Sequence, residues 1–162
     1  MLDQDRANGY ERAHQIAQQR MLKWIDRQPH ELPTANGFLV GLLWEMHRSS
    51  DDEFWATKAE SLAKLLDDHW AVSSATSDIS QSCMYSHLPW YLQSKDRQHR
   101  EVIFQAATAL ATRFHHKGRF LGSPVHPDQL SLTVMLEVPV SFYAANETLD
   151  QVIARHATAH CR

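Results

Sequence analysis

The sequence repeats one arrangement of apolar and polar positions three times. In each repeat a stretch that is apolar on nearly all sides is followed by a short polar break and then by a stretch with a single apolar face. The apolar stretches cover 37–46, 79–92 and 130–145, and the one-faced stretches cover 53–66, 102–114 and 152–157. A helix that is apolar all round must be buried on most sides, whereas a helix with one apolar stripe lies at the surface. The pattern therefore predicts helical hairpins, each with an inner and an outer helix.

A further helix is predicted over residues 10–27, ahead of the first repeat. Its apolar positions share one helical face and are Ala13, Ile16, Ala17, Met21, Trp24 and Ile25. Pro29 and Pro33 end this helix, because proline removes a backbone donor and restricts the residue before it. Inner helices as apolar as these need neighbours on several sides, which a ring supplies better than an open row. We therefore expect an all-α fold in which about seven helices form a partial ring of an (α/α) toroid, in a single domain over residues 1–162.

Several local signals predict where helices begin and bend. Residues 50–53 (Ser-Asp-Asp-Glu) have the spacing of a capping box, and residues 146–148 (Asn-Glu-Thr) are a second start signal. Pro89 and Pro139 lie inside apolar stretches, where each kinks the helix or marks its first turn. Residues 115–127 form the longest predicted loop, which is too short to separate two domains.

Composition and charge exclude several classes of protein. The 162 residues carry 16 basic and 19 acidic side chains, a balance that does not favour a nucleic acid or an anionic membrane as partner. No apolar run approaches the roughly 20 residues that span a bilayer. The first six residues are polar, unlike a secretion signal, and two cysteines make no disulfide framework. We expect a soluble, cytoplasmic protein.

Three segments of the chain are similar to a known family, the unsaturated glucuronyl hydrolases and the related unsaturated rhamnogalacturonyl hydrolases. The first is Asn-Gly-Phe-Leu-Val-Gly-Leu-Leu-Trp at 36–44 with Asp-Asp-Glu-Phe at 51–54, which resembles the family's G-F-x-x-G-x-L-W helix and G-D-E-x-Y turn. Residues 76–85, with 106–114 behind them, resemble the H-D-L-G-F helix and its outer helix. Residues 132–144 resemble I-D-x-x-M-N-L-P-L-L-Y-W-A, and His156-Ala157 stands where the family also has His-Ala. The resemblance covers nearly all of this chain and about the first half of a family member.

This resemblance implies a six-hairpin (α/α) barrel and a particular hydrolysis. The family removes the unsaturated uronyl residue that polysaccharide lyases leave on oligosaccharides. An aspartic acid protonates the C4=C5 double bond and activates a water that adds at C5, after which the hemiketal opens. No metal and no organic cofactor are implied. The chemistry needs a carboxyl group that acts as acid and then as base near neutral pH.

The resemblance transfers the family's acidic residues only in part. Asp78 falls on the first family aspartate, with Ser77 in place of the histidine before it. Thr133 falls on the main acid/base aspartate, and its hydroxyl cannot supply a proton near neutral pH. Glu137 falls on the asparagine four residues later and lies on the same helical face. Asp78 and Glu137 are thus the candidate catalytic residues; the alternatives are a helix N-cap for Asp78 and a helix-rim or assembly contact for Glu137.

Trp44, Tyr85 and Trp90 are the candidate substrate-binding residues, because aromatic faces stack on sugars. The alternative is that residues at helical spacing are simply part of the core. Cys83 lies in an apolar segment and is expected to be a packed thiol.

Two histidine-rich segments have open interpretations. His156, His160 and Cys161 have a metal-ligand spacing but no accompanying glutamate, so we expect an outer helix without a metal. Residues 115–119 (His-His-Lys-Gly-Arg) either contact an anionic sugar or form a solvated helix end.

Two hypotheses about function follow. The chain is an unsaturated uronyl hydrolase-like protein acting on lyase-generated oligosaccharides, impaired by Thr133. The alternative is a non-catalytic, truncated α/α repeat that serves as an interaction or assembly module. A partial ring would expose inner-helix surface, so we expect a homodimer or a partner that completes the ring.

Overall fold

The computed structural model describes residues 2–27, 37–72, 79–123, 126 and 128–162. The chain divides into two compact units, residues 1–34 and residues 35–162, and each is described by itself. The single domain over residues 1–162 stays a prediction. Among the described residues, none of the helices combines the length and the apolar character that a membrane-spanning segment requires.

The first unit holds one helix, α1 (Leu2–Arg27). The predicted helix is confirmed and begins at Leu2, eight residues before the predicted start at residue 10, because the polar residues ahead of the apolar stripe continue the same helical backbone. It ends at Arg27, two residues before Pro29, in agreement with the predicted stop.

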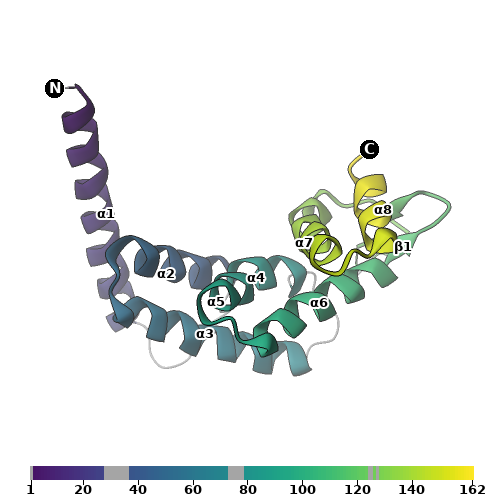
Figure 1. Cartoon of the computed structure of the whole chain (residues 1–162), viewed down its shortest axis with the longest axis horizontal. Coiled ribbons are helices and arrows are strands. Elements are labelled where there is room, and N and C mark those ends of the chain that lie inside the picture. Colours follow the sequence, from purple (N-terminus) through teal and green to yellow (C-terminus); the bar gives the residue numbers. More distant parts are fainter. Residues whose placement is uncertain (1, 28–36, 73–78, 124–125, 127) are drawn as a thin grey trace. The chain divides into compact units, whose positions relative to one another are not determined.

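The second unit is built from helical hairpins, as predicted (Figure 1). Its elements are α2 (Gly37–Ser50), α3 (Glu53–Val72), α4 (Ile79–Tyr85), α5 (His87–Ser94), α6 (Arg97–Thr112), β1 (Phe114–His115), β2 (Phe120–Leu121), the 3-10 helix η1 (Leu132–Leu136), α7 (Val138–Thr148) and α8 (Gln151–His160). The predicted loop after α6 begins with a small antiparallel pair, in which Phe114 faces Leu121 and His115 faces Phe120.

The hairpins stand side by side. The inner helix α4 packs against α2 on one side and α7 on the other. Each outer helix packs against the inner helix of its own hairpin: α3 against α2, α6 against α4 and α5, and α8 against α7. The main core lies where the second and third hairpins meet. Its fully or nearly fully buried residues are Cys83, Ile103, Ala106, Ala107, Leu110, Leu121, Val134, Val138, Val140, Ala144 and Ala157. This row of inner helices backed by outer helices is the partial toroid wall expected from the sequence.

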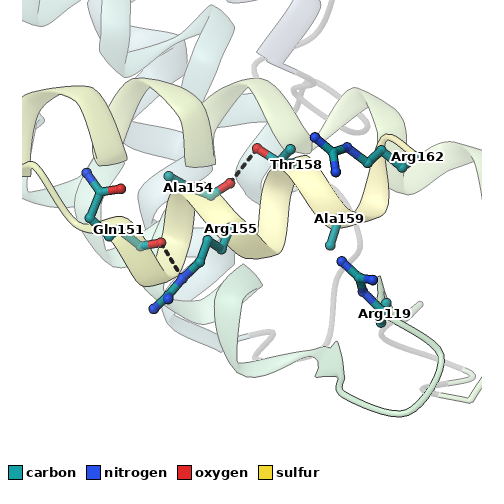
Figure 2. Close-up of a pocket in the computed structure, with 7 residues that line it drawn as sticks. All are labelled: Arg119, Gln151, Ala154, Arg155, Thr158, Ala159 and Arg162. Atoms are coloured by element: carbon teal, nitrogen blue, oxygen red, sulfur yellow. Dashed lines mark hydrogen bonds between the residues drawn. The ribbon is translucent and has the colours of Figure 1, made fainter.

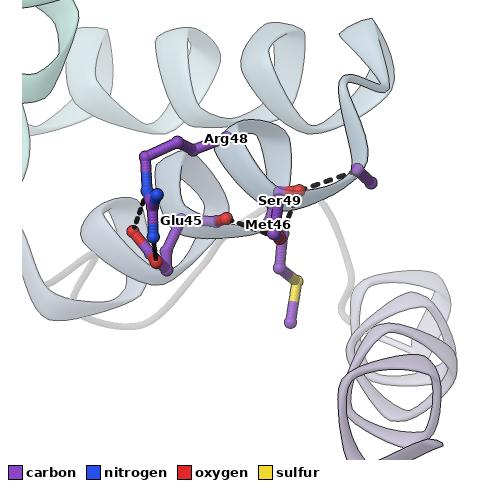
Figure 3. A network of polar contacts seen from close by, with 5 residues as sticks. Glu45, Met46, Arg48 and Ser49 are labelled. Carbon is purple, nitrogen blue, oxygen red and sulfur yellow. Dashed lines mark hydrogen bonds and ion pairs between the residues drawn. The ribbon is translucent and has the colours of Figure 1, made fainter. Parts of the chain in front are cut away.

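The predicted capping box at 50–53 is wrong by two residues. Helix α2 continues through Ser50, whose hydroxyl donates to the carbonyl of Met46 at 2.7 Å, and the Ser49 hydroxyl donates to the Glu45 carbonyl at 2.8 Å (Figure 3). Asp52 caps α3 instead, since its Oδ1 accepts from the Phe54 N–H at 2.9 Å. Both serine hydroxyls bond back to carbonyls one turn earlier in α2 and are therefore not available to begin α3.

The two prolines act as predicted. The stretch 79–92 is divided into α4 and α5 at Ser86, because Pro89 has no N–H for the carbonyl four residues earlier and its ring crowds that carbonyl. Pro139 lies in the first turn of α7, after η1. The start signal at 146–148 is wrong: α7 runs through those residues, and Asp150 caps α8 by accepting from the N–H groups of 152 and 153.

Candidate functional site

Two glycines bring the inner helices α2 and α4 into close contact. A Cβ added at Gly37 would lie 2.4 Å from the Cα of Ser82, and one added at Gly41 would lie 3.0 Å from the Cβ of Tyr85. The absence of side chains at these positions lets the α4 backbone lie directly on α2. Beside the contact, the rings of Phe38 and Tyr85 are 4.5 Å apart, and 47% and 40% of these residues are exposed. An aromatic pair with accessible edges is therefore formed where α2 meets α4.

The two tryptophans predicted to bind sugar are buried where α2 meets α5. The rings of Trp44 and Trp90 are 6.3 Å apart, and only 3% and 7% of these residues are exposed. The indole N–H of Trp44 is buried and has no hydrogen-bond partner among the described residues. Of the three predicted substrate-binding residues, Tyr85 is thus the one with an accessible ring, while sugar binding by any of them stays a prediction.

A chain of ionisable side chains runs from the surface into the space behind Trp90. Asp67 Oδ1 on α3 lies 2.9 Å from Nε2 of the fully buried His87 on α5, and Nδ1 of His87 lies 3.4 Å from Nδ1 of His99 on α6. The ring of Trp90 stacks on His99 with centroids 3.7 Å apart. Burial, followed by the neighbouring His87, lowers the pKa of His99. These contacts join α3, α5 and α6 through polar side chains, with a half-exposed carboxylate at one end and buried imidazoles at the other.

Sequence spacing does not reveal this cluster, because its members come from three helices. Cys83, which is fully buried in the core, is affected by one member of the cluster. Burial raises the pKa of the Cys83 thiol, and the negative charge of Asp67 raises it further. Cys83 is therefore protonated and packed, as expected from the sequence.

The positions that the family resemblance relates to catalysis lie in different surroundings. Glu137 stands at the start of α7 with 3% of its side chain exposed, and it forms an ion pair with Arg113 at the end of α6. Thr133 lies exposed on η1, where its hydroxyl is 2.8 Å from that of Ser131. Asp78 lies outside the described residues. The structure therefore shows Glu137 in a buried pair that joins two helices, while its catalytic role stays a prediction.

The histidines of α8 hold the small β-hairpin. His160 Nδ1 accepts from the Leu121 N–H at 3.1 Å, and the ring of His156 stacks on Phe114 with centroids 3.9 Å apart. Burial is the largest cause that lowers the pKa of both histidines. Throughout the described residues, no three His, Cys, Asp or Glu side chains gather in a way that could hold a metal ion. The metal-ligand spacing in α8 thus corresponds to a packing contact.

The fold belongs to the α/α-barrel class. A solved structure of the unsaturated glucuronyl hydrolase from Streptococcus agalactiae is similar to this chain, with a TM-score of 0.67 and 20% sequence identity. The similarity covers 83% of this chain and 36% of that chain, so this chain spans little more than a third of its neighbour's length. No family model matches the sequence, and neither does any curated protein. The resemblance to unsaturated glucuronyl hydrolases is thereby confirmed at the level of the fold.

Proposed function

We propose that this chain is an unsaturated uronyl hydrolase-like protein that acts slowly on lyase-generated oligosaccharides by hydrating the C4=C5 double bond. The observation that carries the proposal is the fold similarity over 83% of the chain to an unsaturated glucuronyl hydrolase. The same family resemblance stands in the sequence on all three hairpins. No cofactor is part of the proposed reaction.

The accessible aromatic pair supports the choice of the inner face as the substrate site. Phe38 and Tyr85 present ring surface beside the α2–α4 contact, and Tyr85 is one of the predicted sugar platforms. An aromatic ring with one exposed face stacks on the apolar face of a pyranose, while its hydroxyl remains in water. We place the uronyl residue against this pair.

The proposed proton donor is Asp78. Thr133 cannot donate a proton near neutral pH, and its hydroxyl lies against that of Ser131. Glu137 is buried in an ion pair with Arg113, where protonation would break the pair. We therefore assign to Glu137 a role in joining α6 to α7, and to Asp78 the acid/base step; loss of the second family aspartate accounts for the low expected rate.

The second candidate function is a non-catalytic α/α module. The pairing of Glu137 with Arg113 favours this alternative, since it leaves that carboxylate in a structural contact. Under this alternative the inner face is an assembly surface.

The proposed partner is a second copy of this chain, which completes the ring. Apart from the Phe38–Tyr85 pair assigned to the substrate, the inner helices expose Leu42 and Phe142, at 44% and 43%. A monomer rarely leaves a large contiguous apolar surface in water, so these side chains favour association through the inner face. Cytoplasmic localisation, where lyase products would be processed after uptake, belongs to the same proposal.

The test follows the absorbance of the unsaturated uronyl double bond in a panel of lyase-generated disaccharides. We expect decay above the buffer rate for the wild-type chain, none for Asp78→Asn, and unchanged decay for Asp128→Asn, a matched change at an exposed aspartate. Absence of decay in the wild type would leave the non-catalytic module as the function. Decay that survives in Asp78→Asn would mean that another residue is the acid.

A further inference from the structure

A pocket of about 350 Å³ lies between α8 and the turn that joins β1 to β2 (Figure 2). Three arginines line it: Arg155 on α8, Arg162 just beyond the end of α8, and Arg119 in the turn. This pocket is separate from the inner face on which the proposed function rests. It also contains one end of the basic segment 115–119, for which the sequence left an anionic sugar as one interpretation.

The guanidinium groups of the pocket have no acidic side-chain partner among the described residues. No Asp or Glu lines the pocket, and no described Asp or Glu forms an ion pair with Arg119, Arg155 or Arg162. Like charges held around one small volume repel one another, and a bound anion would relieve that repulsion. The whole chain carries a formal charge of −3, so the cluster is a local feature and does not follow from a basic composition.

Local hydrogen bonds position two of the three arginines, Arg119 through its backbone and Arg155 through its side chain. Arg119 sits in a turn with φ of 58° and its N–H donates to the His115 carbonyl at 2.7 Å, which sets where its side chain leaves the hairpin. Arg155 Nε donates to the Gln151 carbonyl at 3.1 Å, so its two terminal nitrogens remain available as donors. Ala154 and Ala159 line the pocket with methyl groups only, which leaves room between the guanidinium groups.

The other polar groups of the pocket also suit an acceptor-rich ligand. Thr158 directs its hydroxyl hydrogen to the Ala154 carbonyl at 2.8 Å and is not a donor to the pocket. Among the described residues, the side-chain amide of Gln151 forms no hydrogen bond with another residue, so it can add N–H donors. The site therefore offers many N–H donors and three guanidinium groups, and no Asp or Glu side chain among its lining residues.

We propose that this pocket binds a tetrahedral oxyanion, carried by a sugar as a sulfate ester or a phosphate monoester. The planar fork of an arginine matches two oxygens of such a group, and a tetrahedral anion has enough oxygens to engage more than one fork at once. A carboxylate has two oxygens and occupies one fork, so it gains less from a pocket lined by three arginines. The proposal does not depend on hydrolytic activity.

The test is an NMR titration of backbone amides and arginine Nε–H groups at constant ionic strength and pH 7.5. The ligands are inorganic sulfate, inorganic phosphate, glucose 6-sulfate, glucose 6-phosphate and glucuronate. The variants are Arg155→Gln and Arg162→Gln, and Arg97→Gln at the exposed start of α6 is the charge-matched control. Far-UV circular dichroism checks that each variant keeps its helices.

We expect saturable shifts at residue 119 and over 151–162, about tenfold weaker binding in each pocket variant, and unchanged binding in the control. A preference between glucose 6-sulfate and glucose 6-phosphate identifies the source of the oxyanion, and weaker binding of glucuronate supports the tetrahedral group. Shifts that do not saturate, or an equal loss in Arg97→Gln, would overturn the proposal in favour of general charge screening. Binding of glucuronate as tight as that of glucose 6-sulfate would also overturn it.

Discussion

Gly37 is the position at which a single methyl group tests the packing of α2 on α4. In Gly37→Ala the new Cβ would lie 2.4 Å from the Cα, 2.7 Å from the carbonyl oxygen and 2.9 Å from the carbonyl carbon of Ser82. All three atoms belong to the backbone of a helix, so no side chain can rotate away. The two helices must separate by more than about 1 Å to restore ordinary contact distances of roughly 3.5–4 Å.

The expected loss of stability follows from that separation. Overpacking in a close contact costs typically 1–3 kcal/mol, and the case of Gly37 lies at the upper end because only backbone can move. Gly37 is the first residue of α2, where replacing glycine by alanine gains little helix propensity. We expect Gly37→Ala to lower the free energy of unfolding by about 3 kcal/mol.

Gly41 and Gly9 provide a graded comparison. At Gly41 the nearest atoms to a new Cβ are the Tyr85 Cβ at 3.0 Å and the Tyr85 carbonyl oxygen at 3.2 Å. A helix-propensity gain of about 1 kcal/mol then nearly balances the crowding, so Gly41→Ala should change stability by less than ~1 kcal/mol. Gly9 in α1 has no atom within 4 Å of a new Cβ, so Gly9→Ala should not destabilise the protein.

The assay is urea unfolding followed by fluorescence of the buried Trp44 and Trp90. With a slope of about 2 kcal/mol per molar urea, a 3 kcal/mol loss moves the midpoint by about 1.5 M. A midpoint for Gly37→Ala equal to that of the wild type, or to that of Gly41→Ala, would refute the close packing of α2 on α4.

Three other properties follow from single contacts. Burial lowers the pKa of His160 below its ordinary value of 6.5. The contribution of neutral His160 to stability is therefore complete above pH 6.5 and is lost as the pH falls through the lowered pKa. In His160→Asn, the free energy of unfolding should depend less on pH in that range. Glu137→Gln should cost about 3 kcal/mol in denaturant unfolding because it leaves Arg113 without its buried partner, and a loss below ~1 kcal/mol would show that the pair is not a helix junction. In the native protein one thiol, that of the exposed Cys161, should react rapidly with a thiol reagent, whereas Cys83 should react only on unfolding; two fast thiols would contradict the buried position of Cys83.

The hairpin pattern could be predicted because burial leaves a direct trace in the sequence. The apolar run at 37–46 predicts a buried helix, and Val40 and Leu43 in α2 are fully buried. The same run does not reveal which neighbour covers each face, and Phe38 and Leu42 turn out to be 47% and 44% exposed. A sequence pattern reports that a face is apolar, whereas its coverage is decided by tertiary packing.

Helix starts could be predicted less well, since several residues near each start have suitable chemistry. Ser50 and Asp52 are both good N-caps, and the choice depends on whether α2 uses the Ser50 hydroxyl for its own last turn. The same competition moves the start of α8 to Asp150. Local propensity allows each of these outcomes, and the geometry of the preceding helix selects one.

Clusters assembled from distant elements could not be predicted from spacing at all. Asp67, His87 and His99 come from three helices and meet only when those helices pack. The closeness of Arg155 and Arg162 along the chain is visible in the sequence, but the approach of Arg119 from the hairpin turn is a tertiary event. For this reason the sequence indicated only the basic segment 115–119, whereas the structure shows that Arg119 lines a pocket with Arg155 and Arg162.

The central claim is that the inner face formed by α2 and α4 receives an unsaturated uronyl oligosaccharide. An NMR titration of the Asp78→Asn variant with an unsaturated disaccharide tests this most directly, since the variant should bind without turnover. We expect the largest saturable shifts at Phe38, Gly41 and Tyr85 on that face. Saturable binding whose shifts fall only on other surfaces, or no binding at millimolar disaccharide, would contradict the claim.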